Sequence, residues 1–133
     1  IMRPINILIV DDQESNIITM QSMLEEHLDN IVIHTENSGS TCLEATLRQK
    51  FDIILLDILM PDMDGFEVIK FLKSNERTKD IAVIFMTAIF ESSNFENKGL
   101  QMGAIAYLTK PFDITMTIAI IEREIENIYK REA

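Results

Sequence analysis

This sequence predicts a doubly wound α/β fold, a five-stranded parallel sheet with helices on both faces. Five apolar segments rich in β-branched residues alternate with five segments whose apolar residues recur every three or four positions. The central apolar segments do not alternate with polar residues, which is typical of strands buried on both faces. Strands that alternate with helices favour right-handed crossovers and a parallel sheet. The apolar periodicity alone leaves the order of the strands open.

The expected elements follow one another without an internal repeat, a linker or a low-complexity segment. We expect strands at residues 5–10, 31–35, 53–56, 81–86 and 106–108. We expect helices at about residues 14–28, from the turn at 37–40 to about 49, at 66–75, at 94–102, and from 113 past 129. Asp113 is the expected amino-terminal cap of the last helix, and Gly103 is expected to stop the helix before it.

The spacing of apolar residues also predicts which helix residues face the core. These are Ile17, Met20, Leu24 and Leu28 in the first helix, Leu43 and Leu47 in the second, and Phe66, Ile69 and either Leu72 or Phe71 in the third.

The last helix carries a heptad pattern formed by Ile114, Ile118, Ile121, Ile125 and Ile128. We expect Ile118 and Ile121 to pack on the domain, but a single domain hardly needs the pattern to reach Ile128. Met116 and Ile120 lie off the same stripe, which leaves apolar surface for a partner. We therefore hypothesise that this helix continues toward an attached output domain or pairs with a second copy in a homodimer.

Length, composition and charge limit the class of protein. The 133 residues, 47% hydrophobic and 26% charged, fit a single globular domain spanning residues 1–133. The net charge of −10 argues against nucleic-acid binding and against adhesion to anionic membranes, both of which need clustered Lys and Arg. No apolar run reaches transmembrane length, and no signal-peptide core is present. The single cysteine, Cys42, excludes an internal disulfide, so we expect a reducing, cytoplasmic setting.

The two ends of the sequence suggest that this domain is the amino-terminal part of a longer protein. The segment Met2-Arg3-Pro4 directly before the first expected strand looks like a natural start, and the helical pattern continues to Ala133.

Polar residues with a common chemistry follow four of the expected strands. Asp11 and Asp12 follow the first strand, Asp57 the third, Thr87 the fourth, and Lys110 the fifth. Parallel strands present their carboxyl ends at one edge of the sheet, where ligands bind in open α/β folds. Clustered carboxylates need a compensating cation, and Mg²⁺ prefers oxygen ligands. A carboxylate beside a metal, a lysine and a hydroxyl is a reasonable phosphoryl acceptor.

Each of these residues alone is ordinary, but their joint order along the chain is specific. The segments ILIVDDQESN, IILLDILMPDMDG, IFMTA and AYLTKPF resemble the receiver domain of two-component response regulators. The resemblance covers the chain from Ile5 to about Lys130. It implies a phosphoacceptor signalling switch in a two-component phosphorelay rather than an enzyme. A histidine kinase or a histidine phosphotransfer protein would be the partner, and the strand order would be 2-1-3-4-5.

The resemblance also implies a role for each site residue. Asp57 is similar to the phosphorylated aspartate, and Asp11 and Asp12 to its acidic pair. Mg²⁺, for which Mn²⁺ can substitute, would be bound by Asp12, Asp57 and the backbone carbonyl of Leu59, with Asp11 acting mainly through a metal-bound water. Lys110 would pair with the phosphoryl group, and its peptide bond to Pro111 would be cis.

The switch pair implied by the same resemblance is Thr87 and Tyr107. Tyr107 would turn inward when Thr87 moves toward the phosphoryl group, and this would change the face formed by the final strand and helix.

Two positions beside the site carry apolar residues in this sequence. Leu59 lies two residues after Asp57, and Ile89 lies two after Thr87. Neither side chain can position an attacking water, so we expect slow self-dephosphorylation, with an aspartyl phosphate that lasts many minutes or longer. Ala88 is small, which suits open access for a phosphodonor.

Several alternatives are weaker. An aspartate-nucleophile phosphatase needs a second Asp two residues after its nucleophile, where Asp57 has Leu59 and Asp11 has Gln13. A flavodoxin-like electron carrier needs a hydroxyl- and glycine-rich phosphate loop after the first strand. The acidic segment at residues 11–14 would repel a phosphate instead. A receiver-like domain used only for interaction is disfavoured by the intact phosphorylation motif. The DMDG segment lacks the other ligands of an EF-hand calcium loop, and His27 and His34 lack the four-helix context of phosphotransfer histidines.

Overall fold

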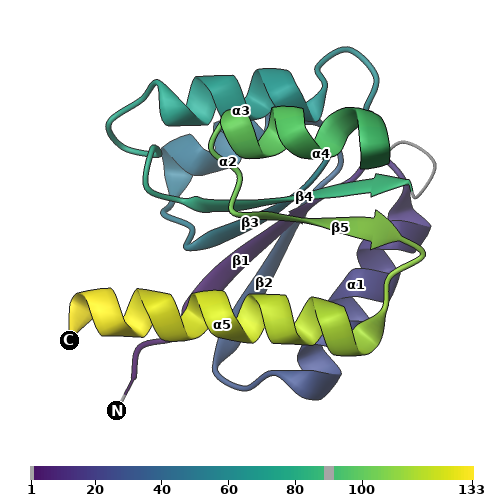
Figure 1. The fold of residues 1–133 in the computed structure, drawn as a ribbon. Coiled ribbons are helices and arrows are strands. Elements are labelled where there is room, and N and C mark those ends of the chain that lie inside the picture. The colour runs from purple at the N-terminus through teal and green to yellow at the C-terminus, as the bar shows by residue number, and fades with distance from the viewer. Residues whose placement is uncertain (1, 89–91) are drawn as a thin grey trace.

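The computed structural model describes residues 2–88 and 92–133, and it contains every predicted strand and helix (Figure 1). The strands are β1 (Ile5–Val10), β2 (Ile31–Glu36), β3 (Ile53–Asp57), β4 (Ala82–Ala88) and β5 (Ala106–Lys110). The helices are α1 (Glu14–His27), α2 (Gly39–Arg48), α3 (Gly65–Lys73), α4 (Ser92–Gln101) and α5 (Ile114–Glu132). The predicted boundaries differ from these mainly at β4 and β5, which run on to include Thr87 and Lys110.

All five strands are parallel and lie in the order β2-β1-β3-β4-β5. This is the order that the receiver resemblance implied. Val10 at the end of β1 pairs with Leu56, and Asp57 at the end of β3 pairs with Met86. Lys110 pairs with Ala88 at the end of β4. The register therefore brings the polar residues at the carboxyl ends of β1, β3, β4 and β5 to one edge of the sheet.

Helices cover both faces of the sheet, with α1 and α5 on one face and α2, α3 and α4 on the other (Figure 1). Side chains of β1 and β3 point alternately to the two faces. Ile9 and Leu55 join the core under α1 and α5, whereas Leu8 and Ile54 join the core under α2, α3 and α4. Burial on both faces explains why these strands read as continuous apolar runs.

Local hydrogen bonds fix the ends of the helices near the site. The carboxylate of Asp64 accepts from the backbone of Glu67, and the Glu67 side chain accepts from the backbone of Asp64, which forms a capping box at the start of α3. Asp113 caps α5 as predicted, since its carboxylate accepts from the Met116 backbone at 2.8 Å. Gly103 ends α4 with a φ of 109°, the left-handed conformation that favours glycine.

The predicted inward face of α2 is wrong at one position. Leu47 is 67% exposed, whereas Cys42, Ala45 and Thr46 are buried. Small side chains at the buried positions allow α2 to pack closely, and Leu47 lies on the outer side of the last turn. In α3 the core residue is Leu72, and Phe71 is exposed. Leu43, the other residue predicted to face inward, is partly buried and packs against the core as expected.

The apolar stripe of α5 also differs from the expectation. Ile128 is only 4% exposed and belongs to the same core cluster as Ile118 and Ile121. The domain itself therefore uses the pattern over almost its whole length. The exposed apolar residues of α5 are Ile114 and Met116, near its amino-terminal end.

The end of α5 is joined to the first residues of the chain. The Arg3 guanidinium donates to the carboxylates of Asp52 and Glu132, and the Tyr129 hydroxyl donates to the Arg3 carbonyl at 2.7 Å. Asn30, with a φ of 59°, donates from its side chain to the same carbonyl and to the Tyr129 hydroxyl. We call Arg3, Asn30, Asp52, Tyr129 and Glu132 the terminal clamp.

None of the helices in the described ranges combines the length and the apolarity that crossing a membrane requires.

Candidate functional site

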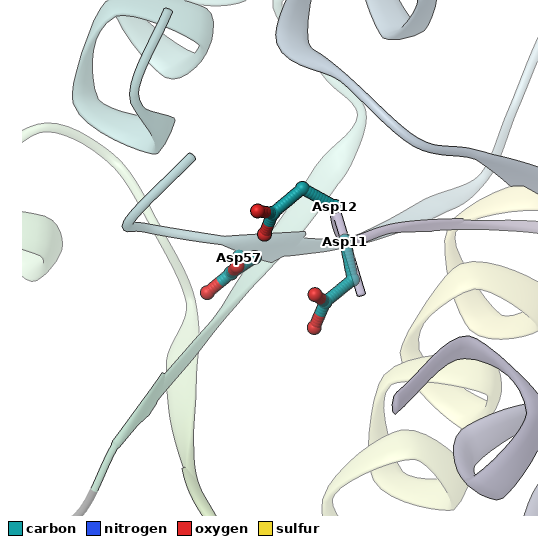
Figure 2. Close-up of side chains that lie close together, drawn as sticks. All are labelled: Asp11, Asp12 and Asp57. Atoms are coloured by element: carbon teal, nitrogen blue, oxygen red, sulfur yellow. The ribbon is translucent and has the colours of Figure 1, made fainter. Parts of the chain in front are cut away.

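Three carboxylates meet at the carboxyl edge of the sheet (Figure 2). Asp11 and Asp12 directly follow β1, and Asp57 is the last residue of the neighbouring strand β3. One oxygen from each carboxylate lies within 4.8 Å of the other two. Asp11 and Asp57 are buried, whereas Asp12 is exposed. The sheet thus gathers the acidic residues that the sequence placed at separate strand ends.

Lys110 brings a positive charge to these carboxylates from the end of β5. Its ammonium lies 2.8 Å from Asp11 Oδ2 and 3.2 Å from Asp57 Oδ1. Asp11 also accepts a hydrogen bond from the backbone of Gln13 at 2.9 Å, which fixes its carboxylate. The peptide bond between Lys110 and Pro111 is cis, as the resemblance implied.

The acidic cluster strongly affects the pKa of Asp57. Burial, followed by the charge of Asp11, raises the pKa of Asp57 to about 7, although Lys110 acts in the opposite direction. Burial alone would lower the pKa of Lys110, but its hydrogen bond to Asp11 and the charge of Asp57 raise it above its ordinary value. One ammonium therefore does not fully compensate the negative charge of this site.

The donor set of the site fits a hard divalent cation. Carboxylate oxygens are the ligands that Mg²⁺ prefers, and three carboxylates lie here with one ammonium beside two of them. Leu59 lies beside the cluster and is 53% exposed. The role of its backbone carbonyl as a metal ligand stays a prediction.

Thr87 and Tyr107, the predicted switch pair, lie on the adjacent strands β4 and β5. Thr87 is 2% exposed, and its hydroxyl donates to the Ala88 carbonyl at 3.5 Å. The Tyr107 hydroxyl donates to the carboxylate of Glu96 in α4, and this hydrogen bond is the main cause that raises the pKa of the phenol. The two side chains thus have separate hydrogen-bond partners, and their coupling stays a prediction.

The acidic cluster opens into a cleft of about 340 Å³. Its lining residues are Asp12, Gln13, Asn16, Asp57, Leu59, Thr87, Ala88 and Lys110. Sequence analysis did not single out the amides Gln13 and Asn16 as site residues. Asn16 carried no separate signal in the sequence, because Asp12 precedes α1 and one polar residue in the first turn of a helix is ordinary. Ile89, predicted to border the site, lies outside the described residues.

A larger hollow of about 730 Å³ lies at the opposite edge of the sheet, near the starts of β3 and β4. Two of its basic residues form hydrogen bonds to backbone carbonyls of neighbouring segments. Lys73 donates to the carbonyls of Lys79 and Ile81, and Arg77 donates to the carbonyl of Thr46 in the last turn of α2. These hydrogen bonds stabilise the fold and leave the two side chains less available to a ligand, so the smaller cleft is the better candidate site.

Comparison with known proteins identifies the family of this chain. The family model described as the response regulator receiver domain matches residues 7–122. Response regulator PleD of Caulobacter vibrioides is 39% identical over 113 residues, which are 85% of this chain and 24% of that protein. Transcriptional regulatory protein ZraR of Escherichia coli is 33% identical over 129 residues, which are 97% of this chain and 28% of that protein.

A solved structure extends the similarity to the fold. The receiver domain of a sensor histidine kinase from Pseudomonas aeruginosa, with a magnesium ion coordinated in its active-site cleft, matches with a TM-score of 0.81 and 26% identity. The match covers 92% of this chain and 98% of that one. The chain spans about a quarter of the length of the first curated relatives that it matches. The matched family model, the strand order and the acidic cleft together show that the chain belongs to the receiver-domain family of two-component response regulators.

Proposed function

We propose that this domain is a phosphoacceptor switch that receives a phosphoryl group on Asp57 from a histidine kinase or a histidine phosphotransfer protein. The position of Asp57 carries the proposal, because it is buried, lies at the floor of an open cleft and contacts Lys110 at 3.2 Å. An oxygen of the Asp57 carboxylate forms a bond to phosphorus while the phosphorus–nitrogen bond of the donor histidine breaks. The imidazole leaves as a neutral ring once it has taken a proton.

Asp11, Asp12, Asp57 and the carbonyl of Leu59 are the proposed metal-binding groups. A bound Mg²⁺, or Mn²⁺ in its place, would offset the charge of the carboxylates and of the transferred phosphoryl group. Lys110 supplies a second positive charge. It already lies between Asp11 and Asp57, so it can exchange a carboxylate contact for a phosphoryl oxygen without a large movement.

Thr87 and Tyr107 are the proposed route from the phosphoryl group to the surface. Among the described residues, the Thr87 hydroxyl makes only a long contact with the Ala88 carbonyl, so little of that contact is lost when it turns toward a phosphoryl oxygen. Movement of Thr87 would leave room for Tyr107, which would exchange its hydrogen bond with Glu96 for an inward position. This rearrangement would alter the face formed by β5, α4 and α5.

The downstream partner is proposed to be an output domain attached after α5, in a longer protein with this domain at its amino terminus. PleD and ZraR are about four times the length matched here, which supports a longer protein. A homodimer through α5 would have to use its exposed residues Ile114 and Met116, because Ile128 is buried in the domain. A cytoplasmic location without nucleic-acid or membrane binding fits the net charge of −10.

Intact-mass measurement after incubation with a small phosphodonor such as acetyl phosphate and Mg²⁺ tests the proposal. The wild-type chain should gain one phosphoryl group, and Asp57→Asn should gain none. Asp62→Asn, which alters a nearby carboxylate that lies outside the acidic cluster, serves as the control and should be labelled like wild type. Equal labelling of wild type and Asp57→Asn would overturn the assignment of Asp57.

A further inference from the structure

Two uncharged amides line the phosphoacceptor cleft and have no part in the proposed phosphorylation. The charged lining residues Asp12, Asp57 and Lys110 are assigned to the metal and the phosphoryl group, and Thr87 to the switch. Leu59 and Ala88 have side chains that cannot form hydrogen bonds. Gln13 and Asn16 are therefore the lining side chains still available to bind a neutral molecule such as water.

Asn16 is the better held of these two amides. It lies in the first turn of α1, where its backbone donates to the Gln13 carbonyl at 3.0 Å, and it is partly buried. Gln13 precedes the helix, is exposed, and makes no side-chain cap to α1. In the described part of the chain no hydrogen bond is formed by the Asn16 carboxamide, which keeps two donors and one acceptor oxygen free.

We propose that Asn16 positions the water that hydrolyses the aspartyl phosphate, an inference that rests on the proposed phosphorylation of Asp57. The water oxygen forms a bond to phosphorus, and the bond between phosphorus and the Asp57 oxygen breaks. Asp57 leaves as a carboxylate, and the water protons end on inorganic phosphate and solvent. The Asn16 carbonyl oxygen accepts a hydrogen bond from this water, while its NH₂ group donates to a phosphoryl oxygen.

The expected size of the effect follows from the loss of one uncharged hydrogen bond. Such a bond corresponds to about a fivefold change in rate, or about 1 kcal/mol at 1.36 kcal/mol per tenfold. A side chain within the helix, such as that of Asn16, loses less conformational freedom on binding a water than the exposed side chain of Gln13 before the helix. The effect should therefore be seen at Asn16 and not at Gln13.

The test is the rate at which the phosphorylated chain loses its phosphoryl group after the donor is removed, in saturating Mg²⁺, followed by intact mass. Asn16→Ala and the larger Asn16→Leu should both lose it about fivefold more slowly than wild type. Gln13→Ala, the matched control, should stay within about twofold of wild type. The rise in melting temperature caused by Mg²⁺ should be the same in all four proteins, since Asn16 is assigned to water and not to the metal.

The outcomes separate this inference from the proposed function. Failure of wild type to gain a phosphoryl group would overturn both. If wild type is phosphorylated but both Asn16 variants lose the phosphoryl group at the wild-type rate, only the role of Asn16 is overturned. Equal slowing in Gln13→Ala, or a changed Mg²⁺ response in both Asn16 variants, would also overturn it, because the effect would then not arise from water held by Asn16.

Discussion

Asp57→Asn removes a buried negative charge while keeping the volume of the side chain, so it should stabilise the metal-free domain at alkaline pH. Burial and Asp11 raise the pKa of Asp57 from 3.8 to about 7 in the folded protein. Between these pH values the folded state holds a proton that the unfolded state has lost. The wild type therefore loses stability as pH rises from about 4 to about 7, and the variant lacks this loss.

The size of the effect follows from the same two pKa values. The two pKa values differ by about three, and each pKa unit corresponds to 1.36 kcal/mol. The free energy of unfolding of the wild type should therefore fall by about 4 kcal/mol in total by pH 8. About 2 kcal/mol of it falls between pH 5.5 and pH 8, a range that avoids the isoelectric point near 4.5. The free energy of unfolding of Asp57→Asn minus that of wild type should therefore grow by about 2 kcal/mol over this range.

Urea unfolding in EDTA, followed by circular dichroism at pH 5.5, 6.5, 7.5 and 8, measures this difference. Glu25→Gln is the control, because it removes an exposed carboxylate of α1 at a distance from the acidic cluster. Its difference from wild type should stay nearly constant with pH. A difference between Asp57→Asn and wild type that also stays constant would refute the assignment of the pH-dependent loss of stability to the buried Asp57 charge.

Three further predictions test other parts of the site and the fold. Mg²⁺ should raise the melting temperature of wild type more at pH 8 than at pH 5.5, because the ionised Asp57 is the stronger ligand; equal increases at both pH values would contradict this. Leu59→Asn should shorten the lifetime of the aspartyl phosphate about fivefold by offering one hydrogen bond to water, measured by intact mass, and a wild-type lifetime of seconds would contradict the expected slow decay. Gly99→Ala should lower the urea midpoint, because its Cβ would lie 2.7 Å from Phe85 Cδ2. Overpacking of about 1–3 kcal/mol exceeds the helix-propensity gain of about 1 kcal/mol, and a raised midpoint would show that α4 can move aside.

The fold and the location of the site could be predicted because both depend on features that are local in sequence. Continuous apolar runs such as Ile53–Asp57 mark buried strands, and parallel strands place their ends together whatever lies between them. The sequence alone therefore predicts that the carboxylates of Asp11 and Asp57 meet. The roles assigned to these residues rest on resemblance and chemistry, and they stay predictions until phosphorylation is measured.

Side-chain orientation on the helices could not be predicted in the same way. Leu47 and Ile128 are both apolar, yet one is exposed and the other is buried. The difference depends on how closely each helix approaches its neighbours, which the sequence pattern does not record. Asn16 was missed for a related reason, since a single polar residue early in a helix is ordinary until the neighbouring strands place a cleft beside it.

The terminal clamp has a consequence for the order of folding. Arg3 and Glu132 are 129 residues apart, so their contact closes a loop of nearly the whole chain. Closing a flexible loop of that length costs about 4 kcal/mol of entropy, whereas ion pairs between exposed side chains contribute little. The clamp can therefore form only after the sheet has brought its partners together. Hydrogen exchange at the last turn of α5 should accordingly report opening of the clamp, at a lower free energy than global unfolding of the sheet.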